Sequence, residues 1–156
     1  ALHQPMATDL RVIVSAVKIN SDLERIGDFA VNVAEAALGY LAHPSVKPLI
    51  DIPRMDELAQ GMLRDSLDAY IKHDTLLAKD VIKRDDEVDE LKDKVFRELL
   101  NLMLKDTSIT EPSLDLILIS RHLERIGDHA TNIAEEVIFI ESAQDVRHHA
   151  QEGGAD

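Results

Sequence analysis

Apolar residues recur at spacings of three and four along most of this chain, which is the pattern of amphipathic helices. The first such stretch runs from about Met6 to about Ala42. It ends before Pro44, because the residue that precedes a proline is pushed out of the helical region. A second stretch, from about Arg54 to about Lys72, follows a segment that contains three prolines. The spacing therefore predicts long helices and an all-α fold.

Two further helices are expected after the second. Asp74 is a suitable N-cap for a third helix that extends to about Lys105, although one bent helix across this point is the alternative. Thr110 can cap a fourth helix, Pro112 suits its first turn, and the apolar pattern continues to about Ala143. The third helix has an apolar residue at every seventh position, which predicts a packing seam. These residues are Val81, Val88, Val95 and Leu102.

The predicted elements divide the chain into four parts. Residues 1–43 hold the first long helix, residues 44–53 a proline-rich extended linker, residues 54–146 an antiparallel three-helix bundle, and residues 147–156 a polar tail that is expected to be disordered. The third and fourth helices should be antiparallel neighbours, because only a short turn joins them. The first helix has an apolar stripe that needs a cover, so copies of this helix are expected to pack together in an oligomer.

The composition narrows the classes of function. The chain has 30 acidic and 17 basic residues and a formal net charge of −13, which argues against binding to nucleic acid and suits cations or basic partner surfaces. It has no cysteine, so disulfides and thiolate metal sites are excluded. No apolar run approaches the roughly 18 residues of a membrane span, and no membrane insertion is expected.

A six-residue motif occurs twice, as Leu23–Asp28 and as Leu123–Asp128. Ten of the thirteen positions from 23 to 35 are identical one hundred residues later, so the chain contains a duplication. On a helix, the glutamate and the aspartate of each motif point in nearly the same direction, and the asparagine and glutamate that follow point much the same way. The acids of the two motifs are Glu24, Asp28, Glu124 and Asp128.

The motif has two features that destabilise a helix. Like charges at i and i+4 destabilise a helix by roughly 0.2 to 0.5 kcal/mol, and glycine within a helix costs about 1 kcal/mol relative to alanine. A cation among the carboxylates would relieve the repulsion, and a close neighbour would explain Gly27 and Gly127. The alternative is that Arg25 and Arg125 pair with the aspartates three residues later on a solvated face.

Six acids between residues 85 and 93 form a second acidic segment. Asp85, Asp89 and Asp93 follow one another at i+4, in a row along the third helix. If the short turn is taken as a centre of symmetry, Asp89 lies opposite Asp128, Asp93 opposite Glu124, and Asp85 opposite Asn132, with an uncertainty of one helical turn. Carboxylates gathered in such a seam must be protonated, paired with Lys or Arg, or bound to metal.

Oxygen ligands alone favour hard cations, so the candidate ions are Mg²⁺, Mn²⁺ and Ca²⁺, with iron also allowed. In the alternative interpretation, basic residues of the third helix neutralise its row of aspartates, and these acids only keep the helix surface solvated. These basic residues are Lys83, Arg84, Lys92 and Lys94.

The sequence favours a protein without enzymatic activity. No histidine has a glutamate three residues before it, which disfavours the ferritin-like carboxylate oxidases. Phosphate-binding loops, nucleophile elbows and His-Glu-x-x-His motifs are also absent. His122 and His129 flank the second motif and are interpreted as helix-surface residues. Two alternatives stay open: a carboxylate-bridged metalloenzyme, and a structural helical adaptor without functional metal.

These motifs together resemble the PhoU family. The resemblance rests on the doubled Leu-Glu-Arg-Ile-Gly-Asp, the Asn-Ile-Ala-Glu that follows its second copy, and the Arg-Asp-Asp-Glu-Val-Asp of residues 84–89, and it extends from Leu2 to about Val146. Members of this family contain two similar three-helix bundles in tandem. Only the third helix of the first bundle has a counterpart here, so the resemblance implies a chain that is truncated at its N-terminus.

The resemblance also implies site residues. In the family, acidic motifs on the first and third helices of each bundle face each other and, in some members, bind metal clusters. The corresponding metal ligands of the second bundle are Asp85, Asp89, Glu124 and Asp128, and Glu24 and Asp28 belong to the first bundle.

The function implied by the resemblance is that of a cytoplasmic, non-enzymatic negative regulator of the phosphate-starvation (Pho) regulon that modulates high-affinity phosphate uptake. The expected partners are the ATPase of the phosphate ABC transporter and its sensor histidine kinase, between which the protein acts as an adaptor. A homo-oligomer is also expected, most simply a dimer.

Overall fold

The computed structural model describes the backbone of residues 4–152 and the side chains of residues 10–142. Four long helices and one short 3₁₀ turn make up this part of the chain, and it has no β-strand. They are α1 (Gln4–Leu41), α2 (Asp51–Lys72), α3 (Thr75–Lys105), η1 (Thr107–Ile109) and α4 (Thr110–Glu152). The predicted all-α fold is confirmed.

Two separate helices, α2 and α3, are present where one bent helix was the alternative. His73 ends α2 in the left-handed conformation, with φ of 55°. Asp74 then caps α3, and its Oδ1 accepts hydrogen bonds from the backbone N–H groups of Leu76 and Leu77 at 3.0 Å each. The N-cap predicted at Asp74 is confirmed.

Two helix boundaries differ clearly from the predicted ones. The α2 helix begins at Asp51, so Pro53 lies in its first turn and not in the linker. In the turn before α4, Asp106 Oδ1 accepts a hydrogen bond from the backbone N–H of Ser108 at 3.0 Å. The α4 helix continues to Glu152, so residues 147–152 are helical and not part of a disordered tail. Residues 153–156 of that predicted tail lie outside the described residues.

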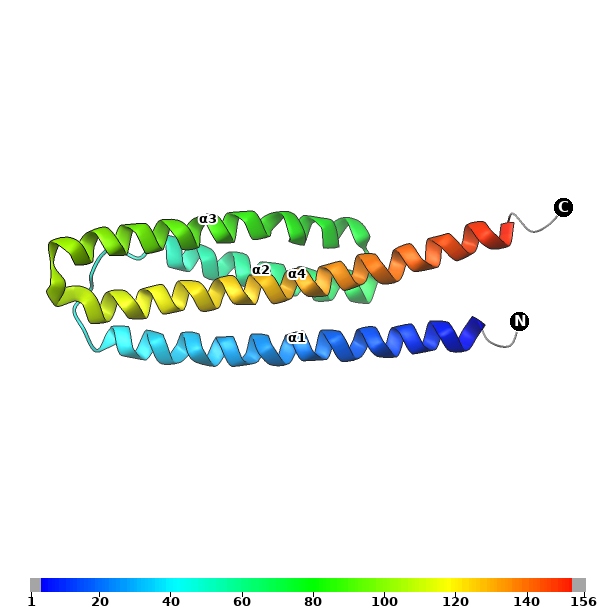
Figure 1. The fold of residues 1–156 in the computed structure, drawn as a ribbon, viewed down its shortest axis with the longest axis horizontal. Coiled ribbons are helices and arrows are strands. Elements are labelled where there is room, and N and C mark those ends of the chain that lie inside the picture. The colour runs from blue at the N-terminus through cyan, green and yellow to red at the C-terminus, as the bar shows by residue number, and fades with distance from the viewer. Residues whose placement is uncertain (1–3, 153–156) are drawn as a thin grey trace.

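The α4 helix is the centre of the molecule, because it contacts each of the other three long helices. It runs antiparallel to α3, as predicted, with α3 on one side and α1 on the other (Figure 1). The predicted seam of α3 is confirmed at Val81, Val88 and Val95, which are fully buried, whereas its fourth member, Leu102, is partly buried. Met55 and Met62 of α2 and Leu116, Ile133 and Val137 of α4 complete this core with them.

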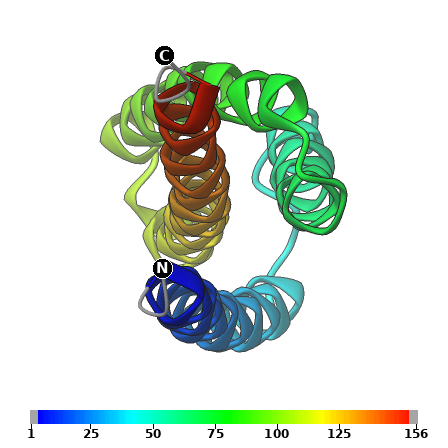
Figure 2. The same cartoon turned by 90° about the vertical axis from the view of Figure 1, so that its right-hand side faces the viewer.

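The α1 helix contacts only α4 within the part of the chain that the structure describes. Figure 2 shows α1 next to α4 and away from α3. One stripe of α1, which includes Ile19 and Ile26, is buried against α4. The cover of this stripe, expected from a second copy, is provided by α4 of the same chain.

A second apolar stripe of α1 remains exposed. It consists of Leu10, Val12, Ile13, Val14, Val17, Val31, Leu38 and Leu41. Among the described residues, none of the helices combines the length and the apolar content that crossing a bilayer requires.

Candidate functional site

The second copy of the acidic motif lies where α4 packs against α3. Glu124 and Asp128 project toward α3, and their side chains are only 17% and 33% exposed. Asp85 and Asp89 of α3 are also partly buried. Asp89 and Asp128 lie close enough to Asp85 that their charges raise its pKa. We refer to these four carboxylates as the acidic seam. The structure therefore brings together the four residues predicted for the second bundle.

Gly127 explains how the two helices approach each other at the acidic seam. A Cβ atom at this position would lie 3.4 Å from Asp85 Oδ1 and 3.6 Å from Met62 Cε. The missing side chain thus leaves room for the Asp85 carboxylate and for the core methionine. At Gly27, in the first copy of the motif, a Cβ atom would meet nothing within 4 Å. The close neighbour predicted for both glycines is confirmed for Gly127 and is wrong for Gly27 among the described residues.

The electrostatic environment of the acidic seam disfavours full ionisation. Burial, followed by the charges of Asp128 and Asp89, raises the pKa of Asp85 from its ordinary value of 3.8 to about 6. Burial and the neighbouring Asp128 also raise the pKa of Glu124. The seam therefore carries excess negative charge near neutral pH.

The raised pKa of Asp85 makes folding stability depend on pH. Between about pH 4 and pH 6 the folded chain holds a proton that the unfolded chain has released, so stability falls as pH rises through this window. A shift of this size corresponds to about 3 kcal/mol, which solvent screening at this partly exposed site reduces to about 1 kcal/mol. In the absence of metal, we expect Asp85→Asn to stabilise the chain by about 1 kcal/mol at pH 7.5 and to have little effect at pH 4.

Urea unfolding at the two pH values measures this difference. Glu90→Gln is the matched control, because Glu90 is exposed on the same helix and lies outside the acidic seam. An equal gain from both variants at pH 7.5 would show that removing general negative charge, and not relieving Asp85, is the cause.

The register of the helices differs by about one turn from the one derived by symmetry. Asp85 lies beside Asp128 and Thr131, not opposite Asn132. Asn132 points to α1 instead, where its Nδ2 donates a hydrogen bond to Asp22 Oδ1 at 3.3 Å. The asparagine of the motif therefore does not share a direction with the motif acids in the second copy.

One basic residue of α3, Lys92, lies at one end of the acidic seam. Lys92 Nζ lies 3.5 Å from Asp89 Oδ1 and 3.5 Å from Asp93 Oδ1. Burial alone would lower the pKa of Lys92, but the carboxylates of Asp89, Asp93 and Glu124 outweigh burial and raise it. Lys92 therefore carries a positive charge at this end.

The other three basic residues expected to neutralise the row of acids do not do so. Arg84 pairs with Asp65 at 2.6 Å and Asp80 at 3.0 Å, and Lys94 pairs with Asp51 at 2.9 Å. Lys83 makes no ion pair with another described residue. Of the four basic residues expected to neutralise the row of acids, only Lys92 does so.

The arginine of the motif pairs with its aspartate in one copy only. Arg125 Nη1 lies 3.2 Å from Asp128 Oδ2, and Arg125 Nε lies 3.8 Å from Glu124 Oε2. The Arg125 side chain is more than half exposed, so this pair is worth less than about 1 kcal/mol. Asp85 has no basic partner of its own among the described residues.

The chemistry of the Asp85 end fits a hard cation. Its donors are carboxylate oxygens that lack full compensation. The hydroxyl of Thr131 lies beside Asp85, and this buried oxygen has no hydrogen bond of normal geometry. Among the described side chains, however, no three His, Asp or Glu groups converge closely enough to hold a metal ion. The seam thus presents pairs of carboxylates, which a bound cation would have to draw together or reach through water.

The first copy of the motif is in a different environment. Glu24, Arg25 and Asp28 are exposed on α1, on the side away from α4. These three side chains form no ion pair with a described residue, so the predicted Arg25–Asp28 pair is not formed. The structure therefore does not bring Glu24 and Asp28 together with the acidic seam.

The two histidines beside the second motif are interface residues, which corrects their interpretation as surface residues. His129 Nδ1 lies 2.7 Å from Asp22 Oδ1 of α1. The ring of Phe29 packs against His122 and His129, with centroid distances of 5.8 and 5.7 Å. The sequence contained a signal for this contact. The second copy has histidine at positions 122 and 129, whereas the first copy has Asp22 and Phe29 at the equivalent positions.

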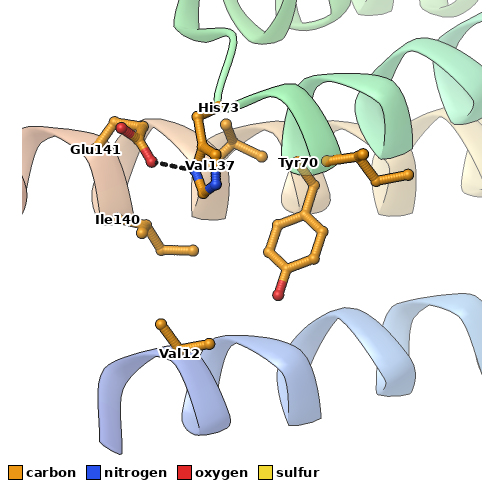
Figure 3. A pocket seen from close by; sticks show the side chains of 7 residues that line it. Val12, Tyr70, His73, Val137, Ile140 and Glu141 are labelled. Atoms are coloured by element: carbon orange, nitrogen blue, oxygen red, sulfur yellow. Dashed lines mark hydrogen bonds and ion pairs between the residues drawn. The ribbon is translucent and has the colours of Figure 1, made fainter. Parts of the chain in front are cut away.

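A separate apolar pocket lies further along α4, between α1, α2 and α4 (Figure 3). At its rim, His73 Nδ1 lies 2.6 Å from Glu141 Oε1. The pocket is lined by Val12, Tyr70, Ile71, His73, Val137, Ile140 and Glu141. None of the six predicted metal ligands lines it, so it is not an extension of the acidic seam.

The fold and the acidic seam define a class of all-helical bundle proteins that carry a repeated acidic motif on equivalent helices. A family model described as the PhoU domain matches residues 1–37 and 52–137. The chain belongs to the PhoU family, as the sequence resemblance predicted.

Individual relatives agree with this assignment. The "Phosphate-specific transport system accessory protein PhoU homolog" of Aquifex aeolicus is 45% identical over 155 residues, which cover 99% of this chain and 70% of the relative. The protein of the same description from Caulobacter vibrioides is 48% identical over 140 residues, or 89% of this chain and 61% of the relative. The chain therefore spans between 61% and 70% of the length of these two relatives.

Solved structures show the same fold. The crystal structure of PhoU from Pseudomonas aeruginosa superposes with a TM-score of 0.85 and 39% sequence identity, covering 90% of this chain and 68% of that one. The structure of the phosphate transport system regulatory protein PhoU from Streptococcus pneumoniae gives a TM-score of 0.78 and 29% identity, with 87% and 64% coverage.

Proposed function

We propose that this chain is a cytoplasmic, non-enzymatic regulator of phosphate uptake that represses the phosphate-starvation regulon. The observation that carries the proposal is membership of the PhoU family, with relatives named as accessory proteins of a phosphate-specific transport system. The site agrees with a regulatory role, because its described side chains are carboxylates, the Lys92 ammonium group and the Arg125 guanidinium, without a nucleophile placed beside a general base.

The proposed partners are the ATPase of a phosphate ABC transporter and the sensor histidine kinase that responds to it. Long helical surfaces suit docking, and the net charge of −13 favours basic partner surfaces. In this role the chain is an adaptor that joins transporter and kinase when phosphate is plentiful.

Binding of the purified chain to each partner tests this proposal. We expect saturable binding to the isolated transporter ATPase and to the cytoplasmic part of the kinase, and no binding to the ATPase of an unrelated ABC transporter. In a bacterium that lacks its own PhoU protein, the chain should lower expression from a phosphate-starvation promoter in phosphate-rich medium. A folded chain that binds neither partner and leaves the promoter active would contradict the proposal.

We also propose that the acidic seam binds a divalent cation of the Mg²⁺, Mn²⁺ or Ca²⁺ type, or iron. Support comes from the unrelieved charge at Asp85, beside which lies the buried hydroxyl oxygen of Thr131. When bound, the cation would supply positive charge that neutralises the seam and links α3 to α4. The ligands in the acidic seam would be Asp85, Asp89, Glu124 and Asp128. A separate site on α1 would include Glu24 and Asp28.

Homo-oligomerisation is proposed for the exposed apolar stripe of α1 defined above. Exposed apolar side chains at both ends of α1 favour association, and a second copy of the chain, as a dimer, is their proposed cover. A monodisperse monomer at micromolar concentration in analytical ultracentrifugation would contradict this.

A further inference from the structure

The helices α1 and α4 are the two copies of the duplicated segment, and they pack on each other through equivalent positions. Position 22 of α1 faces position 129 of α4, and position 29 of α1 faces position 122 of α4. Since positions 22 and 122 are equivalent, as are 29 and 129, the two contacts are related by a local two-fold axis. The antiparallel course of α1 and α4 in Figure 1 agrees with this symmetry.

The side chains at these positions break the symmetry. Asp22 Oδ1 lies 2.7 Å from His129 Nδ1 and accepts a hydrogen bond from Asn132 at 3.3 Å. At the other end of the axis, Phe29 stacks on His122 at 5.8 Å, with the rings inclined by 30°, and its ring centroid also lies 5.7 Å from that of His129. The Asp22 and His129 side chains are 17% and 21% exposed, so this polar pair is largely removed from water. One contact is therefore polar and the other aromatic.

Pairing of two identical helices in the same register would lose both contacts. Two α1 helices would place Asp22 of each against Phe29 of the other, which buries a carboxylate without a donor. Two α4 helices would place His122 against His129 twice and leave both without an acidic partner. Only the mixed pair satisfies all four side chains.

We propose that Asp22, Phe29, His122 and His129 form a specificity set that selects pairing of α1 with α4 and excludes α1–α1 and α4–α4 pairing between copies through this buried face of each helix. Unlike residues at matched positions specify partners in this way when the wrong pairs leave polar groups unsatisfied. The set flanks both acidic motifs, so this pairing also fixes the first motif on the face of α1 that points away from the acidic seam.

The substitution Phe29→His tests the specificity set directly. It would make α1 self-complementary, because Asp22 of each copy would face the new imidazole of the other copy. It would also remove the stacking of Phe29 on His122. We therefore expect α1–α1 pairing between copies to rise several-fold in this variant.

Two cysteine pairs report the two kinds of pairing, since the chain has no native cysteine. Lys18→Cys with Glu136→Cys reports α1–α4 pairing, because Lys18 Nζ lies 3.4 Å from Glu136 Oε2. Lys18→Cys with Ala36→Cys reports α1–α1 pairing, because position 36 is the equivalent of 136. On one helix these two positions are about 27 Å apart, so a short bis-maleimide can join them only between copies and gives a covalent dimer.

In the otherwise unchanged chain, we expect efficient cross-linking of the first pair and almost none of the second. Phe29→His should raise cross-linking of the second pair, whereas Phe29→Leu, which removes the ring without supplying a partner for Asp22, should not. Circular dichroism of each variant verifies that the helices are intact. The proposal would be overturned if the second pair cross-links as well as the first in the unchanged background, or if Phe29→His and Phe29→Leu give equal yields.

Discussion

Replacement of both Asp85 and Asp128 by asparagine is expected to weaken binding of Mn²⁺ to the chain at least about 100-fold, because loss of a group in the outer shell of a metal site alone typically costs about 10- to 100-fold. The two carboxylates lie beside each other, away from Lys92, and only Asp128 has a basic partner, the exposed Arg125. Asparagine keeps the shape of aspartate and removes the charge that a hard cation requires. Isothermal titration and elemental analysis of the purified chain measure the loss.

The same double variant separates a metal site from a solvated acidic surface. In metal-free buffer at neutral pH it should be no less stable than the parent, because it removes repulsion between partly buried carboxylates. With saturating Mn²⁺ the order should reverse, since only the parent gains binding free energy. Glu111→Gln, at an exposed position at the start of α4, is the control and should bind Mn²⁺ as the parent does. If the parent binds no metal, the acidic seam is a structural feature and regulation depends on the docking surfaces.

Ile133→Ala is expected to destabilise the chain by about 2 to 5 kcal/mol, the range found for large-to-small substitutions in packed cores. Ile133 is completely buried on α4, the helix that contacts α1, α2 and α3. A loss of this size is a large part of the roughly 5 to 15 kcal/mol that stabilises a typical domain. Urea unfolding followed by circular dichroism measures it.

Ile71→Ala is the matched control for this prediction. Ile71 is 71% exposed at the end of α2, so its truncation should change stability by no more than about 0.5 kcal/mol. Similar losses from both variants would mean that Ile71 is covered in solution, as it would be by association of copies near the apolar pocket that it lines.

The elements could be predicted from the sequence because their signals are local. The apolar period, the Asp74 cap and the short turn before Thr110 each act within a few residues, and all three predictions are confirmed. The acidic seam could also be anticipated, because an antiparallel pair of helices must bring acidic segments near the same turn into proximity. Its register was wrong by one turn, since η1 and the packing at Gly127 determine how far the helices slide.

The placement of α1 could not be predicted in the same way. Its apolar stripe showed that it needed a partner, but a stripe does not say which surface provides the cover. The structure shows that α4 of the same chain provides it, with His129 and Asp22 in contact across more than one hundred residues of sequence.

The sequence by itself determined the all-α class, the duplication, the excess of acids and the family, since each of these is a property of residue types and their spacing along the chain. Only the tertiary structure decided that Asp128 lies beside Asp85 and Glu124 near Asp89, while the equivalent Glu24 and Asp28 remain exposed. The physical reason is that two identical motifs have the same local preferences. The helices that pack around each copy determine which of its carboxylates are buried and which remain in water.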